Sequence, residues 1–333
     1  MTSINNNKVL CFGEALLRIQ SSTEHFYEPS NTLKLYPGGS EANVAVSLAH
    51  MGISTSYFTA GPSNKVFKDF VKALSSIGLD TSKIRFEGDR IGSYYLYSAN
   101  GLTQGDVVYD RQYSSFTELN TSTINYDILL ENIDWLHFTA ITPALNSNLA
   151  IICNDLLLAA SNKGITISVD LNYRSKLWQY GKSPQEVMPE LVKYADLIMG
   201  NIWAANKMLG TSINTSLNRH SSVEEYENAA NTTTQEIFDN YPKCKHVAHT
   251  FRFMDNATHN LFYATYHTRN SNYISTIHET NEVVDRIGSG DAFMAGLVRS
   301  IILKETPQQV IEIATNAGFQ KLFVEGDFGN GKF

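Results

Sequence analysis

The chain has 333 residues, of which 43% are hydrophobic and 18% are charged, a composition typical of a globular protein with enough sequence for a sizeable core. A formal net charge of -7 argues against nucleic acid as a partner, and no apolar run reaches the roughly 18 residues that would span a membrane. Three cysteines, Cys11, Cys153 and Cys244, lie far apart in apolar surroundings, which predicts free buried thiols and a cytoplasmic location.

The first 60 residues predict a strand, an irregular segment, a helix and a second strand. "KVLCF" at 8–12 is apolar and β-branched, whereas residues 18–36 are polar and show no helical period. "SEANVAVSLAHMG" at 40–52 has apolar residues at helical spacing and a glycine at its end. "TSYFTA" at 55–60 then predicts the next strand.

A different pattern follows at residues 91–111, "IGSYYLYSANGLTQGDVVYDR". It predicts two alternating strands on either side of the turn-rich "SANGLTQG". Alternating strands do not fit a sheet that is buried on both faces. We therefore expect roughly 15–36 and 90–115 to form a small β-lid over the mouth of the main sheet.

The remainder of the chain alternates apolar strands with helical segments. The expected strands are 134–140, 165–170, 196–200 and 245–250. Helices are expected at 147–164, from Ser183-Pro184 and from Thr306, while the polar stretch 211–235 predicts a surface loop and a solvated helix start. Strands alternating with helices predict one α/β domain over 1–333, with a mostly parallel sheet covered on both faces.

"VVDRIGSGDAFMAG" at 283–296 places small residues where a helix begins. Gly288 and Gly290 allow backbone N–H groups to approach an anion closely, and a helix N-terminus favours negative charge. Asp291 in the first helical turn is then suited to take a proton from a hydroxyl that attacks phosphorus. Glycine-rich loops before helices are common, however, and an aspartate in a first turn also suits the helix dipole alone.

The same stretch resembles the D-x-x-G-A-G-D signature of the ribokinase-like (PfkB) sugar kinases, with Ser289 in place of the usual alanine. "PGGSEANVAVSLAHMG" at 37–52 resembles the N-terminal glycine pair, asparagine and helix of that family. The two motifs occur in family order, so the resemblance covers essentially the whole chain. It implies a ribokinase-like three-layer α/β/α domain.

The resemblance also implies roles for the residues of both motifs. Asp291 would be the general base, and an anion hole would be formed by the N–H groups of Gly288, Ser289 and Gly290. The sugar would be held by Gly38, Gly39 and Asn43. A simple turn after Pro37 is the other interpretation of the glycine pair.

Within the family, several segments are most similar to the kinases of 2-keto-3-deoxygluconate; they are "GEALLRI", "RIGSYYLYSANG", "VVYDRQYSSF", "VDLNYRSKLW" and "EGDF". Neutral-sugar relatives commonly have an aspartate near the position of Arg18. Arg111 and Arg174 match arginines that contact the keto-acid, and Tyr94 and Tyr109 match tyrosines of the same pocket. Arginine suits a carboxylate because its donors form two parallel hydrogen bonds. Taken singly, each arginine is equally explained as a solvated or salt-bridged surface residue.

Two departures from the family pattern concern the nucleotide and metal. The N-x-x-E motif keeps Asn201 but has Ala204 in place of glutamate. The loop expected to wrap the nucleotide phosphates has no glycine and offers Thr250 and Arg252 instead. Asn316 is expected near the adenine. The resemblance implies ATP and Mg²⁺ as cofactors, with the metal ligands left open.

The sequence therefore predicts an ATP-dependent kinase that phosphorylates the primary hydroxyl of a sugar acid, 2-keto-3-deoxygluconate. Two alternatives remain: a kinase for a neutral sugar such as fructose or a nucleoside, and a sugar-binding homologue with impaired catalysis, which Ala204 would explain. A dinucleotide enzyme is disfavoured because "CFGEALL" has a single glycine after the first strand. The exposed lid strands predict a homodimer or higher homo-oligomer.

Overall fold

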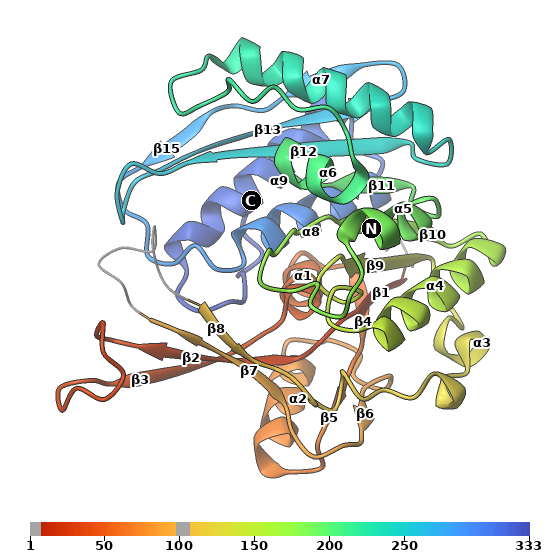
Figure 1. The fold of residues 1–333 in the computed structure, drawn as a ribbon, viewed down its shortest axis with the longest axis vertical. Helices are drawn as coiled ribbons and strands as arrows, with labels where there is room; N and C mark the ends of the chain where they lie inside the picture. The colour runs from red at the N-terminus through yellow and green to blue at the C-terminus, as the bar shows by residue number, and fades with distance from the viewer. Residues whose placement is uncertain (1–7, 98–106) are drawn as a thin grey trace, which may run out of the picture.

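A computed structural model describes residues 8–97 and 107–333 (Figure 1). In the described chain, the largest sheet has nine strands, with β14, β13, β12, β11, β10, β9, β1 and β4 in spatial order and β15 paired to β13. Their bounds are β1 Lys8–Phe12, β4 Ser54–Phe58, β9 Trp135–Thr139, β10 Thr166–Asp170, β11 Leu197–Met199, β12 His246–Phe253, β13 Asn260–Thr268, β14 Asn272–Ile274 and β15 His278–Thr280.

The strands from β4 to β12 pair in parallel, which confirms the expected mostly parallel sheet. Beyond β12 the sheet continues antiparallel through β13 to β14 and β15. This antiparallel edge was not predicted, because its residues 260–280 have no helix between strands and mix apolar with polar side chains.

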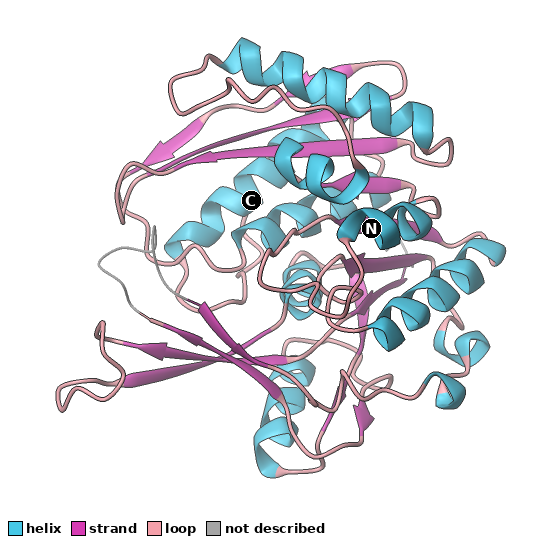
Figure 2. Cartoon of the chain, in the orientation of Figure 1, coloured by secondary structure: helices cyan, strands magenta, loops and turns pink. Residues whose placement is uncertain are grey.

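Helices cover both faces of the sheet, which gives the three expected layers (Figure 2). One face packs mainly on α4, α5 and α6, the other mainly on α1, α2, α8 and α9. The bounds are α1 Ser40–His50, α2 Lys65–Ser76, α3 Tyr126–Leu129, α4 Ser147–Asn162, α5 Pro184–Val192, α6 Ile202–Leu209, α7 Val223–Asn240, α8 Ser289–Ile302 and α9 Pro307–Gln320. None of the helices in residues 8–97 and 107–333 has the length and hydropathy of a membrane span.

Strand β1, which lies between β9 and β4, shows how one strand serves both faces. Leu10 and Phe12 pack in the cluster that contains α4, whereas Val9 and Cys11 pack in the cluster that contains α1. Successive side chains of a strand point to opposite faces, so a fully apolar strand is what a doubly covered sheet requires.

The expected helix boundaries follow local capping chemistry. Capping boxes begin α5 at Ser183 and α9 at Thr306, as the sequence predicts. The helix expected at 147–164 ends at Asn162, and Gly164 has a φ of 71°. The polar stretch 211–235 contains the start of α7.

A separate four-stranded sheet projects from one side of the body (Figure 1). Its strands, in spatial order, are β3 Leu33–Gly38, β2 Leu16–Ser21, β7 Gly92–Leu96 and β8 Val107–Asp110. We call it the lid sheet. Its strands fall within the segments expected for a β-lid, while the expected turn at 98–105 lies outside the described residues. A short two-stranded sheet, β5 Ala60–Gly61 with β6 Arg85–Phe86, lies below it.

The first turn of α1 is joined to the end of β9 by a buried carboxylate. Glu41 is 2% exposed, and its Oε1 accepts hydrogen bonds from the backbone N–H of Thr139 (3.0 Å) and from the hydroxyls of Thr139 (2.7 Å) and Thr142 (3.1 Å). Burial raises the pKa of Glu41 to about 7, although these hydrogen bonds lower it in part.

Replacing Glu41 with glutamine should flatten the dependence of stability on pH. The folded protein binds the Glu41 proton more readily than the unfolded chain does, so the free energy of unfolding falls as pH rises from about 4 to about 7. Glutamine can accept the same three hydrogen bonds and does not titrate. Between pH 5 and 8, we expect the free energy of unfolding of the wild type to fall by on the order of 1–3 kcal/mol relative to that of the variant. Urea unfolding at several pH values measures this, and parallel curves for the two proteins would contradict it.

Candidate functional site

A cavity of ≈ 750 Å³ lies between the carboxyl ends of the central strands and the lid sheet. Its volume is within the range of small-molecule sites. Of the residues singled out in the sequence, the cavity is lined by Gly39, Asn43, Tyr94, Tyr109, Arg111, Arg174, Asn201, Thr250, Arg252, Gly288, Gly290 and Asp291. Gly38, Ser289 and Asn316 are not among the lining residues.

The start of α8 explains the glycine at 288. Gly288 caps the helix with a φ of 81°, and a Cβ there would lie 2.1 Å from the carbonyl oxygen of Asp327. Both the conformation and the close approach exclude a side chain. In the described chain, no hydrogen-bond acceptor is found for the N–H of Gly288 or Gly290, so both groups are available to an anion in the cavity.

The amide of Ser289 differs from its two neighbours because it already has a partner. Its N–H donates to the carbonyl oxygen of Arg286 at 3.2 Å, because the chain turns back on itself as the helix begins. The side chain of Ser289 points instead toward β12, where its Oγ accepts a hydrogen bond from Arg252. Of the three amides expected to form an anion hole, those of Gly288 and Gly290 have no partner in the described chain, whereas that of Ser289 has one.

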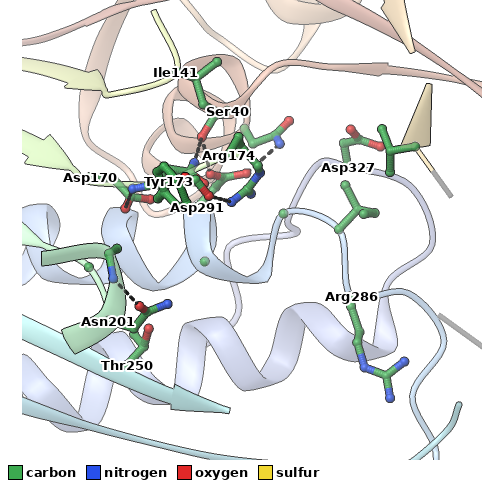
Figure 3. Close-up of a pocket in the computed structure, with 18 of the residues that line it drawn as sticks. Ser40, Ile141, Asp170, Tyr173, Arg174, Asn201, Thr250, Arg286, Asp291 and Asp327 are labelled. Carbon is green, nitrogen blue, oxygen red and sulfur yellow. Dashed lines mark hydrogen bonds between the residues drawn. The ribbon is translucent and has the colours of Figure 1, made fainter. Parts of the chain in front are cut away.

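Asp291 faces the cavity from the first turn of α8 (Figure 3). Its Oδ1 accepts a hydrogen bond from the hydroxyl of Ser40 (2.6 Å), and its Oδ2 accepts one from Nδ2 of Asn43 (2.7 Å). Both partners come from the start of α1 and line the same cavity. Burial raises the pKa of Asp291 above its ordinary value, while these hydrogen bonds and the charge of Arg174 lower it in part. The carboxylate is thus held within the cavity and can accept a proton there.

Each of the two glycines before α1 leaves room for a different neighbouring residue. Gly39 has a φ of 121°, and a Cβ there would lie 2.2 Å from the carbonyl oxygen of Glu14. Gly38 does not line the cavity; a Cβ at that position would lie 2.3 Å from Oδ2 of Asp327. The expected sugar contact of Gly38 is therefore replaced by space for an aspartate.

The inner face of the lid sheet supplies one cation to the cavity. Arg111 is 6% exposed, and its Nε and Nη2 donate to Oε2 of Glu14. The hydroxyl of Ser114 donates to the other oxygen of Glu14 at 2.5 Å. One edge of the guanidinium is thus occupied, and the Nη1 side of Arg111 remains for a ligand. Tyr94 and Tyr109 are cross-strand neighbours on the same inner face.

A second cation and a carboxylate come from the end of β10. Arg174 is exposed and lines the cavity, where its Nη1 donates to the carbonyl oxygen of Tyr173. Asp170 lies near Asp291 (Figure 3). Burial, and then the charge of Asp291, raise the pKa of Asp170 to about 7. A cation bound close to Asp170 and Asp291 would stabilise the ionised form of both carboxylates.

Arg18 joins the lid sheet to the segments that precede α8 and follow α9, and it does not line the cavity. It is fully buried, and its guanidinium donates to Asp285 (2.5 Å) and to Asp327 (2.9 Å). Tyr94 donates to the other oxygen of Asp327 at 2.8 Å. Burial alone would lower the pKa of Arg18, but the charges of Asp327 and Asp285 raise it above its ordinary value. Arg18 therefore holds Asp327 at the cavity wall.

Strand β12 lines the opposite wall of the cavity. Thr250 and Arg252 both line it, because alternate residues of a strand share a face, and Met254, directly after the strand, lines it as well. Asn201 caps α6, and its Oδ1 accepts a hydrogen bond from the N–H of Ala204 at 2.7 Å. The side chain of Asn316 lies on α9 outside the cavity, so its expected contact with adenine has no counterpart in the lining.

Sequence reasoning missed four residues of this arrangement: Glu14, Ser40, Asp170 and Asp327. A signal existed for Asp170, since it ends a buried strand at the edge where ligands of parallel sheets bind. A weaker one existed for Ser40, which follows the glycine pair. Glu14 and Asp327 lie in the similar segments "GEALLRI" and "EGDF", but they are far in sequence from the residues that they contact, so their partners could not be inferred.

Comparisons with known proteins agree with this geometry. The sequence profile described as "pfkB family carbohydrate kinase" matches residues 6–241. A crystal structure of 2-dehydro-3-deoxygluconokinase from Thermotoga maritima is similar, with a TM-score of 0.86 and 32% identity, covering 97% of this chain and 95% of that one. The 2-dehydro-3-deoxygalactonokinase of Haloferax volcanii is 25% identical over 96% of this chain and 92% of its own length. The 2-dehydro-3-deoxygluconokinase of Bacillus subtilis is 21% identical over 95% and 90%, respectively.

Proposed function

The chain belongs to the pfkB family of carbohydrate kinases, and from this premise we propose that it transfers the γ-phosphoryl group of ATP to the primary hydroxyl of 2-keto-3-deoxygluconate. The enzyme is a phosphotransferase that acts on an alcohol group of a sugar. The observation that carries the proposal is the position of Asp291, which shares one cavity with two free glycine amides and several arginines. The names of the similar enzymes from Thermotoga and Bacillus support the choice of sugar acid.

The charges of the cavity favour anionic ligands. Arg174, Arg252 and Arg286 all line it, and burial, together with the charges of Arg286 and Arg174, lowers the pKa of Arg252 to about 10. Like charges at such short range destabilise one another unless an anion lies between them. A sugar acid and a polyphosphate would supply that negative charge, with Arg111 and Arg174 toward the acid.

The phosphoryl transfer would use groups that the chain already holds in place. The hydroxyl oxygen of the sugar attacks the γ-phosphorus as the bond from that phosphorus to the bridging oxygen breaks, and ADP leaves. Asp291 takes the hydroxyl proton, and the N–H groups of Gly288 and Gly290 stabilise charge on the transferred group. Tyr94 and Tyr109, on the lid sheet, would contact the sugar and exclude water.

Mg²⁺ is implied by the family, and the donor set of the cavity fits it in part. In the described chain, no group of three or more histidine, cysteine or acidic side chains could hold a metal by itself. Mg²⁺ is commonly held by one or two carboxylates together with substrate phosphates, and Asp170 offers a carboxylate of raised pKa beside Asp291. We propose that Asp170 holds Mg²⁺ with the nucleotide, where the ion would neutralise phosphate charge. The Oδ1 of Asn201 caps α6, so its Nδ2 would serve as a hydrogen-bond donor to a phosphate oxygen and not as a metal ligand.

A panel of substrates tests the proposed function. ADP release should be measured with 2-keto-3-deoxygluconate, its galactonate epimer, gluconate, fructose and ribose. We expect kcat/KM for a 2-keto-3-deoxy acid to exceed that for either neutral sugar by about 100-fold, because a buried arginine–carboxylate contact is lost with the neutral sugars. Turnover of the neutral sugars alone would overturn the roles of Arg111 and Arg174. ATP binding without turnover of any sugar would identify a catalytically impaired homologue.

The outer face of the lid sheet supports a homodimer. Leu35, Ile19, Tyr95 and Val108 are cross-strand neighbours and form an apolar row on this face, and Leu35 is 61% exposed. We expect light scattering to give about twice the chain mass, and Leu35→Glu to shift the protein toward monomer, since a charge in an apolar interface is costly. A wild type that is strictly monomeric at micromolar concentration would refute the proposal.

A further inference from the structure

Ser289 is the residue at which this chain departs from the alanine of the family signature. It is 2% exposed at the first position of α8. Its N–H is already bonded to the carbonyl oxygen of Arg286, so the amide is not free for a ligand. Its Oγ accepts a hydrogen bond from Nη2 of Arg252 at 2.5 Å. The side chain of Ser289 therefore contacts a residue of the cavity wall, although Ser289 itself does not line the cavity.

Arg252 has an unusual environment for a guanidinium. In the part of the chain that the structure describes, its one hydrogen bond is to Ser289, and it forms no ion pair. It also stacks near the ring of Phe262, at 5.6 Å from the ring centroid. The positive charges of Arg286 and Arg174 lower the pKa of Arg252, whereas the negative charge of Asp291 raises it. A cation in this setting is favourable mainly when an anionic ligand occupies the cavity.

The contact places that cation at the beginning of α8. Ser289 lies between Gly288 and Gly290, so a guanidinium held by its hydroxyl lies beside the two free amides of the turn. A planar guanidinium binds phosphate oxygens well only when its orientation is fixed. The hydroxyl supplies that orientation without neutralising the charge, which a carboxylate at the same position would do.

We propose that Ser289 is a positioning residue whose hydroxyl holds Arg252 against the Gly288–Gly290 turn so that the arginine binds the phosphate chain of the nucleotide. This inference rests on the proposed kinase function and deepens it. The chain also lacks the acidic residue expected at Ala204, which lines the same cavity. Arg252 would thus supply positive charge near the phosphates that does not require an acidic residue of the protein to hold a metal ion.

The test compares two single variants, Ser289→Ala and Ser300→Ala. Ser289→Ala is also introduced into the Arg252→Ala variant, and the double variant is compared with Arg252→Ala alone. Ser300 is a matched control, because it is a fully buried serine of the same helix whose hydroxyl has no hydrogen-bond partner in the described chain. Binding of ADP is measured by calorimetry, together with KM for ATP and for the sugar acid. Thermal unfolding verifies that each variant is folded.

We expect Ser289→Ala to weaken ADP binding and raise KM for ATP by about 10-fold, with KM for the sugar acid changed less than about twofold, since one hydrogen bond to a charged group is lost. Ser300→Ala should match the wild type. In the Arg252→Ala background, Ser289→Ala should add no further loss, because its effect passes through the arginine. Unchanged ADP binding by Ser289→Ala, or an equal loss with and without Arg252, would overturn the inference. A wild type that binds ADP and phosphorylates no sugar would instead overturn the proposed function.

Discussion

Replacing Asp291 with asparagine should lower kcat by about 10³-fold while leaving sugar binding largely intact, because a positioned general base contributes roughly 10²–10⁴-fold. That loss corresponds to ~4 kcal/mol of transition-state stabilisation. Asparagine can keep both neighbours: its oxygen accepts from Asn43, and its amide donates to the hydroxyl of Ser40. Only the capacity to remove a proton is lost. Single-turnover kinetics and calorimetry with the sugar acid separate the two effects.

The pH dependence of the wild type provides a second readout. Asp291 must be ionised to act, and burial raises its pKa, so kcat should fall with decreasing pH at a higher pH than an ordinary aspartate would give. The residual activity of the asparagine variant should lack this acidic limb. Asp239→Asn, which changes an exposed carboxylate on α7, is the matched control and should leave kcat unchanged. A kcat for Asp291→Asn within about tenfold of the wild type would rule out the base role.

Replacing Gly290 with alanine should abolish activity without harming the fold. A Cβ at Gly290 would meet no protein atom within 4 Å, and Gly290 lines the cavity. The added methyl group therefore occupies the space in which a phosphoryl group would approach the amide. Alanine favours a helix over glycine by up to about 1 kcal/mol, so the melting temperature should be equal or higher. We expect kcat/KM for ATP to fall at least about 100-fold, since an anion-hole contact of this kind contributes roughly that much.

The neighbouring glycine provides the contrast. Gly288→Ala forces a positive φ on alanine and brings a Cβ to 2.1 Å from the carbonyl oxygen of Asp327, so it should lower the melting temperature as well as activity. Circular dichroism during heating distinguishes the two variants. Full activity in Gly290→Ala would show that no phosphate approaches this turn.

Much of the fold could be predicted because its signals are local. The strand at 8–12 is apolar and buried after Lys8, and the capping boxes at Ser183 and Thr306 are short sequence patterns. The antiparallel edge at 260–280 could not be predicted in the same way, since its pairing is decided by long-range contacts with β12. Strand propensity depends on such partners more than helix propensity does.

The residues of the candidate site fall into the same two groups, those marked by a local sequence pattern and those placed by long-range contacts. Motifs that combine glycine with a nearby acid, such as 288–291, bring their own geometry and were found. The bond from the N–H of Ser289 to Arg286 could not be predicted, because the direction of one N–H depends on the carbonyl that faces it. The partnership of Glu14 with Arg111 spans 97 residues, and that of Arg18 with Asp327 spans 309. A single sequence gives no indication of pairs so distant.

Asp327 has a consequence for how the enzyme comes into being. The missing side chains of Gly38 and Gly288 both leave room for this residue, and Arg18 and Tyr94 bind its carboxylate. Sheet strands and most helices are complete in the chain before residue 321. During folding, this wall of the cavity is therefore completed only after the lid sheet and the segment that follows α9 have met around one carboxylate.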